Sequence, residues 1–215
     1  PHPVLISLAG RPLYMPGGGL LLGLGMNPAS QDWTVTLAPA TTCFLYTDGL
    51  LEYGRDIVAG ERTLLLAMET IAQEGRRTAD ALHTAIFNGS IANTDDCATL
   101  ALNQTESPEH DALTLRYSAF PLSAALAREA LRTFFSHFAF SEDLKFEMLT
   151  ATGEAVANAI EHGAHDAGNT YTIAASVNER AITISVENRG HWRPFTPRDE
   201  RGRGVPIMRA CAQSL

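Results

Sequence analysis

Four polar residues of chemically useful types stand close together in the stretch "LTATGEAVANAIEHG", residues 149–163. In an α-helix, residues four apart share one face, which places Glu154, Asn158 and His162 on one side with Glu161 beside them. The apolar residues between them are expected to pack into a core: Ala155, Val156, Ala159 and Ile160. Burying such a polar row without partners costs several kcal/mol, so the row is either a solvated face or a binding site.

A second stretch, "RGRGVPIM" at residues 201–208, decides what such a site could bind. Gly202 and Gly204 lead into an expected helix, whose free backbone N–H groups can hold a phosphate. Arg203 could add charge-assisted contacts, as could two further arginines nearby: Arg198 and Arg201. The oxygen of Asn158 suits Mg²⁺, and Glu154 could act as a general base in a partly dry site. The Gly-rich loop therefore favours a phosphate site over a solvated face.

The first half of the chain carries acids where strands are expected to end. Asp48 lies in "YTDGLLE", and Asp95 and Asp96 open "DDCATLAL". Carboxylates gathered at strand ends suit hard divalent cations, and two such metals can activate water for phosphoester hydrolysis. Asp-Gly is also a common turn signal, and a pair of acids often lies in a solvated turn, so the spacing alone leaves both interpretations open.

The elements that must position these residues follow from hydrophobic period and turn signals. The first half is expected to form strands over residues 2–10, 33–39 and 41–49, helices over 60–75 and 78–90, and a last strand over 95–102. This order predicts an α+β fold with a largely antiparallel sheet. The second half is expected to form a strand over residues 114–120, helices over 121–139 and 141–163, a hairpin over 170–188 and a helix over 205–213. This order predicts a two-layer α/β sandwich, and it ends where one more strand is expected. Residues 103–113 are polar, contain a proline and are expected to be a linker.

Composition excludes several classes of function. The 215 residues are 45% hydrophobic and 19% charged, an ordinary balance for one large or two small globular domains. Residues 1–110 hold 5 Lys and Arg against 12 Asp and Glu, and the net charge is −8, so nucleic acid is not an expected partner. No apolar run is long enough to span a bilayer, so a membrane is not expected either. The three cysteines lack metal-ligand spacing and no signal peptide is seen, which predicts a reduced, cytoplasmic protein. Because the chain begins with Pro1, we expect it to be a piece of a longer one.

Four motifs of the first half, in this order, carry a family resemblance: "HPVLI", "GGGLLLGLG", "FLYTDGLLE" and "DDCATLAL". Residues 1–102 resemble the C-terminal half of bacterial metal-dependent serine/threonine phosphatases of the SpoIIE/RsbU type, a β-sandwich with helices. The resemblance implies that Asp48 and Asp95 bind Mn²⁺ or Mg²⁺ in a binuclear centre, with Asp96 the weaker candidate. The family also needs an Asp-rich motif nearer the start of its domain, so we expect these residues to hold only part of the metal site.

Three motifs of the second half carry another resemblance: "GEAVANAIEHG", "VENRG" and "RGRGVPIM". Residues 114–215 resemble the GHKL (Bergerat-type) ATPase/kinase superfamily, specifically anti-sigma-factor serine kinases of the RsbW/SpoIIAB type. The resemblance implies that Asn158 coordinates Mg²⁺ on ATP, that Glu154 takes the proton from a substrate serine, and that His162 and Glu161 play supporting parts. The remaining nucleotide-binding residues that it implies are Asn188, Gly190, Gly202, Arg203 and Gly204.

This second resemblance is imperfect at two positions. The family usually has Asp where this chain has Asn188, and glycine where it has Trp192. Asn188 can still accept a hydrogen bond through its carbonyl oxygen, but its amide end must not face a donor. A bulky Trp192 could stiffen the lid expected over residues 191–201 or stack on a partner.

The pairing of a serine phosphatase with a serine kinase implies a partner-switching regulator acting on an anti-sigma-factor antagonist of the STAS type. A phosphoserine adds nearly two negative charges, enough to disrupt an interface. Two alternatives remain open at this point: a non-catalytic module that binds a sigma factor, an anti-sigma factor or the antagonist, and a structural scaffold. A homodimer through residues 122–139 also remains open, because the same Leu-, Phe- and Ala-rich helix could be plain core.

Overall fold

A computed structural model describes residues 5–8, 11–16, 32–39, 41–52, 54–87, 96–104, 111–163, 169–189 and 204–212. The chain divides into two compact units, which are discontinuous in sequence. Unit 1 holds Pro1–Ser30 and Ala40–Thr105, and unit 2 holds Gln31–Pro39 and Glu106–Leu215. Across the described ranges, no helix is long and apolar enough to cross a membrane.

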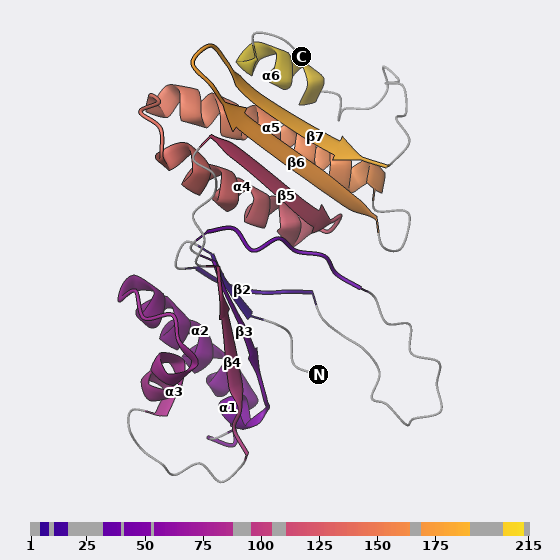
Figure 1. The fold of residues 1–215 in the computed structure, drawn as a ribbon. Helices are drawn as coiled ribbons and strands as arrows, with labels where there is room; N and C mark the ends of the chain where they lie inside the picture. Colours follow the sequence, from indigo (N-terminus) through magenta and orange to yellow (C-terminus); the bar gives the residue numbers. More distant parts are fainter. Residues whose placement is uncertain are drawn as a thin grey trace. The chain divides into compact units, whose positions relative to one another are not determined.

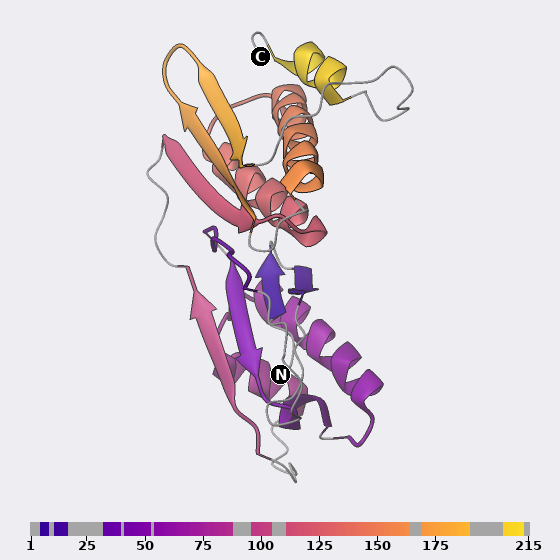
Figure 2. The same ribbon diagram turned by 90° about the vertical axis from the view of Figure 1, so that its right-hand side faces the viewer.

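Unit 1 is an antiparallel sheet covered by helices. Its strand order is β2-β1-β3-β4, with β1 (Leu5–Leu8), β2 (Arg11–Tyr14), β3 (Thr42–Tyr46) and β4 (Thr99–Asn103). Its helices are α1 (Gly49–Glu52), α2 (Ile57–Gln73) and α3 (Ala79–Phe87). Figures 1 and 2 show these helices on one side of the sheet. The register pairs Phe44 of β3 with Leu5 on one side and Ala101 on the other.

The long helix of unit 1 forms because its start is capped and one face is apolar. The Asp56 side chain accepts a hydrogen bond from the Ala59 backbone N–H at 3.1 Å, which satisfies an otherwise free N–H of α2. Leu64, Met68 and Ile71 recur at helical spacing and are buried against the sheet with the rest of the core. The opposite face of the sheet carries three leucines with large exposed fractions: Leu45 (40%), Leu100 (54%) and Leu102 (44%).

Unit 2 is a two-layer sandwich. Its antiparallel sheet has the order β5-β6-β7, with β5 (Ala112–Ser118), β6 (Thr170–Val177) and β7 (Ile182–Asn188). Two long helices, α4 (Pro121–Ser136) and α5 (Glu142–Gly163), cover one face, and α6 (Gly204–Cys211) packs on α5 (Figures 1 and 2). Burial alternates along β5 and β6, as a half-buried sheet requires.

The helices of unit 2 begin where the sequence predicts. Pro121 occupies the first turn of α4, and the Ser141 hydroxyl accepts from the Leu144 backbone N–H at 3.2 Å to cap α5. The apolar side of α4 lies in the core of its own unit, with Phe134 and Phe135 almost fully buried. Those phenylalanines are therefore not available as a surface between two copies of the chain.

The prediction of an α+β fold with antiparallel sheets is confirmed. Two short elements were missed, β2 and α1, because four-residue elements give too little periodicity to detect. The prediction that residues 33–39 form a strand of the first half was wrong. Those residues belong to unit 2, where Val35 makes an isolated antiparallel bridge with Tyr117. The domain limits 1–102, 103–113 and 114–215 stay a prediction.

Candidate functional site

The polar row of the second half lies on α5, as its spacing predicts. Val156 and Ala159 face the core and are buried, whereas Glu154 and Asn158 on the neighbouring face are half-buried. Thr152 is also buried on the core face and satisfies its hydroxyl by donating to the Met148 carbonyl oxygen at 2.7 Å. The helix thus uses its apolar residues for packing and leaves a carboxylate and a carboxamide, one turn apart, available for a ligand.

The start of α6 lies directly against this pair. A Cβ placed on Gly204 would lie 3.1 Å from Glu154 Oε2 and 3.4 Å from Asn158 Nδ2. The α6 backbone thus comes close to both side chains: an added Cβ would crowd the Glu154 carboxylate slightly, whereas it would be in ordinary contact with Asn158. The N-terminus of a helix carries free N–H groups and partial positive charge, so the arrangement joins an anion-binding element to an oxygen ligand and a carboxylate base.

Asn188 stands at the end of β7 and is fixed toward α5. Its Nδ2 donates to the Ala159 carbonyl oxygen at 3.2 Å. This bond orients the carboxamide, because the donor end is engaged and the Oδ1 atom is the end left to accept. Asn188 is connected in this way to the residue that follows Asn158. The structure thus brings together four residues from three elements: Glu154, Asn158, Asn188 and Gly204.

The structure describes only some of the other residues predicted to act in the second half. Gly190, Gly202 and Arg203 lie outside the described residues, as does the lid expected over residues 191–201. Glu161 is exposed and His162 is half-buried, and both lie on α5 one turn beyond Asn158.

The acid-bearing turn of the first half is tied to the start of β4. The Thr47 backbone N–H donates to the Ala98 carbonyl oxygen at 3.0 Å, and the Ala98 N–H returns a bond to the Thr47 hydroxyl at 2.9 Å. The Thr47 hydroxyl also donates to the Asp96 carbonyl oxygen at 3.1 Å. A Cβ on Gly49 would lie 2.5 Å from that same Asp96 oxygen, so glycine is required for the two segments to meet.

Asp48 enters α1 with an exposed carboxylate. Its Oδ1 accepts from the Gly49 N–H at 3.1 Å, which leaves the second oxygen for another partner. Asp96 is exposed on the adjoining segment, and Asp95 lies outside the described residues. Within the ranges that the structure describes, no three His, Cys, Asp or Glu side chains gather closely enough to hold a metal ion. Among the described residues, this turn therefore offers one oriented carboxylate, that of Asp48.

Comparison with protein families divides the chain at nearly the same place. Residues 1–105 match the family model of stage II sporulation protein E (SpoIIE), and residues 117–215 match the histidine kinase-like ATPase domain. The chain therefore joins a SpoIIE-type region to a histidine kinase-like ATPase domain, and each match covers just under half of it. No curated protein matches the chain.

A solved structure resembles the whole chain. It contains the RsbU and RsbW domains of Rv1364c from Mycobacterium tuberculosis, is 22% identical, and superimposes with a TM-score of 0.40. The match covers 99% of this chain and 59% of that one, so the chain spans less than two thirds of the length of its structural relative.

The ATPase domain also has a cavity that the sequence did not reveal. It measures about 770 Å³ and lies between the first half of α5, the β6–β7 hairpin and α6. Apolar residues such as Met148, Ile184 and Met208 line it together with polar ones such as Asn178 and Arg180. None of the predicted nucleotide-binding residues lines it. Hydrophobic period cannot distinguish a residue packed against another side chain from one that lines a cavity, so no signal in the sequence could have found it.

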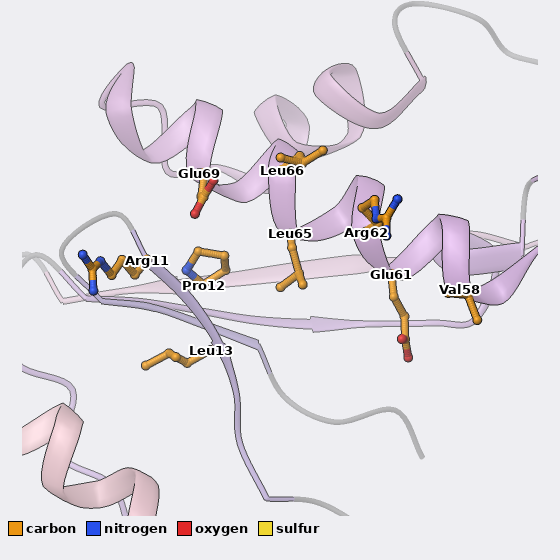
Figure 3. Close-up of a pocket in the computed structure, with 9 residues that line it drawn as sticks. All are labelled: Arg11, Pro12, Leu13, Val58, Glu61, Arg62, Leu65, Leu66 and Glu69. Carbon is orange, nitrogen blue, oxygen red and sulfur yellow. The ribbon is translucent and has the colours of Figure 1, made fainter.

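The SpoIIE-type region has an open groove of about 760 Å³ between β2 and α2. Figure 3 shows Leu65 pointing from α2 toward the strand that carries Pro12 and Leu13. The rim of the groove carries charges of both signs: Arg11, Glu61, Arg62 and Glu69. This groove could not be predicted from the sequence either, because the strand β2 that forms one wall was not predicted.

Proposed function

We propose that the ATPase domain binds Mg-ATP and transfers its terminal phosphate to a serine of an anti-sigma-factor antagonist. The observation that carries the proposal is the close approach of Gly204 to Glu154 and Asn158, at 3.1 Å and 3.4 Å from an added Cβ. It joins a helix start suited to phosphate, an oxygen ligand suited to Mg²⁺ and a carboxylate within one small volume.

Each residue has a distinct part in this proposal. Asn158 would hold Mg²⁺ through Oδ1, and the α6 backbone from Gly204 onward would hold phosphate oxygens. Asn188 would accept from the adenine amino group, a part supported by the engagement of its Nδ2 with the Ala159 carbonyl oxygen. Glu154 would accept the proton of the serine hydroxyl as that oxygen attacks, and ADP would leave with the electron pair of the broken bond.

The proposal is tested by titrating Mg-ATP into the chain by calorimetry and measuring phosphate transfer to antagonist proteins. Asn158→Ala should remove binding. Glu154→Gln should keep binding and lower transfer by about 10²–10⁴-fold, because general-base catalysis contributes on that order. Glu147→Gln is the matched control, since it makes the same change two turns earlier on α5 and should alter neither quantity.

Two outcomes would contradict the kinase proposal. Transfer that survives Glu154→Gln unchanged would remove Glu154 from the chemistry. Absence of ATP binding in both the unmodified chain and Asn158→Ala would favour a binding module for a sigma factor or antagonist. In that case the unmodified chain should still bind the partner protein.

For the SpoIIE-type region we propose that Asp48 and Asp95 contribute to a binuclear Mn²⁺ or Mg²⁺ site, which in a complete domain hydrolyses the phosphoserine that the kinase creates. Support comes from the turn that holds Asp48 against the backbone of Asp96, next to Asp95. The site would activate water for phosphoester cleavage when metal is bound. Loss of Mn²⁺-dependent phosphoserine hydrolysis in a complete domain carrying Asp48→Asn would support this role, and unchanged hydrolysis would exclude it.

A further inference from the structure

A short segment from early in the sequence lies along the outer edge of β5. The Thr36 backbone N–H donates to the Arg116 carbonyl oxygen at 3.1 Å, and the Ser118 N–H donates to the Thr34 carbonyl oxygen at 2.8 Å. Figure 1 shows this segment as a violet trace beside β5. We call residues 32–38 the edge strap. It pairs backbone groups on the side of β5 that faces away from β6.

Side chains reinforce the edge strap. The Ser118 hydroxyl, in a residue only 4% exposed, accepts from the Thr34 N–H at 2.8 Å. The Thr36 hydroxyl accepts from the Arg116 N–H at 2.9 Å and donates to the Arg116 carbonyl oxygen at 3.0 Å. The Trp33 ring meets the Phe120 ring edge-on, with centroids 4.7 Å apart. Removing the strap would leave a buried hydroxyl and several backbone groups without these partners.

The edge strap belongs to two parts of the chain at once. By sequence it lies inside residues 1–105, which match the SpoIIE family model, whereas by its contacts it belongs to unit 2 with the ATPase domain. Only three residues separate it from β3, which begins at Thr42 and delivers Asp48 to its turn. The strap and β3 are therefore joined by a short covalent connection, which limits how far either can move without the other.

We propose that the edge strap is a coupling element that links the order of the SpoIIE-type region to the edge of the ATPase domain's sheet. When β3 unpairs from the sheet of unit 1, the strap dissociates from β5. Conversely, when the strap is bound to β5, the N-terminal end of β3 is restrained. The contacts that carry this proposal do not involve Glu154, Asn158 or Asp48, so it stands whether or not phosphate is transferred.

The position of the strap is tested by amide hydrogen exchange in the full chain, read residue by residue by NMR. The N–H groups of Arg116 and Ser118 face the strap, whereas those of Leu115 and Tyr117 point the other way, toward β6. Thr36→Pro removes the donor and the hydroxyl, and should speed exchange at Arg116 and Ser118 by on the order of tenfold or more while sparing the other two.

Val35→Pro is the matched control, because the N–H of Val35 points away from β5 and every hydrogen bond given above is kept. It should leave exchange at Arg116 and Ser118 near the wild-type rate. Thr36→Val, which removes only the hydroxyl bonds, should speed exchange at Arg116 to a smaller degree. Unchanged exchange at Arg116 in both Thr36 variants would overturn the proposal.

The coupling itself is tested from unit 1. Leu64→Ala opens a gap in the buried core of unit 1, and Leu66→Ala, on the exposed side of the same helix, is its control. Coupling predicts faster exchange at Arg116 and Ser118 in Leu64→Ala, but not at Leu115 and Tyr117, and no change in Leu66→Ala. Faster exchange at Phe44 in unit 1 with no change at Arg116 and Ser118 would refute coupling.

Discussion

Replacing Gly49 by alanine tests whether the Asp48 turn and the start of β4 meet as closely as the structure has them. The new Cβ would lie 2.5 Å from the Asp96 carbonyl oxygen, 3.0 Å from its carbonyl carbon and 3.4 Å from Cys97 Cα. All three atoms are backbone, so no side-chain rotation can relieve the overlap. One segment must move, and the bonds between Thr47 and Ala98 must lengthen with it.

The cost follows from these distances. Overpacking of this kind costs about 1–3 kcal/mol, and each weakened hydrogen bond adds about 1 kcal/mol. We therefore expect the free energy of unfolding of unit 1 to fall by about 2–4 kcal/mol, which lowers the melting temperature of a unit of this size by on the order of 10–20 °C. The proposed role of Asp48 in metal binding predicts that affinity for divalent metal weakens in parallel, because the turn that orients its carboxylate is displaced.

Urea unfolding followed by circular dichroism measures the change. Tryptophan fluorescence reports separately on unit 2, which holds both tryptophans of the chain, Trp33 and Trp192. Gly54→Ala is the matched control, since a Cβ there would meet nothing within 4 Å. It should be neutral or stabilising by up to about 1 kcal/mol. If Gly49→Ala proves as stable as Gly54→Ala, the Asp48 turn does not lie as close to the backbone of Asp96 as these distances require.

Three further predictions concern single side chains. Burial raises the pKa of Tyr171 to about 12, although its hydrogen bond to Ser123 lowers it in part. Because the folded state holds this proton more tightly than the unfolded state, Tyr171 alone should lower stability by about 3 kcal/mol between pH 10 and 12; in urea titrations at stepwise pH, Tyr171→Phe should make the fall shallower but not remove it, since burial also raises the pKa of Tyr117. Arg55 adopts a left-handed backbone with φ of 59°, so Arg55→Gly should raise the melting temperature of unit 1, with a gain of up to about 1 kcal/mol, and a loss of stability would contradict that assignment. Burial raises the pKa of the Cys43 thiol, so at pH 8 it should react with a thiol reagent far more slowly than in urea, and Cys43→Ser should leave the fast phase of the reaction intact.

The long elements could be predicted from sequence because one physical signal dominates each. Helix α5 is predicted by the cap at Ser141 and by the helical spacing of the core residues Val156 and Ala159. The same spacing predicts that Glu154 and Asn158 share a polar face. The approach of Gly204 to that face is a tertiary contact between residues about 50 positions apart. Only the motif resemblance pointed to it, because no local pattern encodes a distance between two helices.

The segment 33–39 shows why the remaining part could not be predicted. Its alternating residues suit an extended conformation, and the expectation of an extended segment near a sheet was sound. Nothing local in that pattern determines which sheet edge the segment joins, because the backbone groups of Thr34 and Thr36 could pair with any free strand edge in suitable register. The same limit applies to Asn188, whose bond to the Ala159 carbonyl oxygen depends on how β7 meets α5.

The discontinuity of unit 2 also sets an order of events during synthesis. The hydrogen bonds between the edge strap and β5 join residues 80 and 84 positions apart in sequence. At about 5–20 residues per second, the strap leaves the ribosome several seconds before β5 exists to receive it. Closing so long a loop costs entropy that nearer pairs do not, so these bonds should form late, after β5 and β6 have paired. Until the strap binds, it is accessible to chaperones and to other nascent chains, and so is the unpaired edge of β5 once that strand has been made.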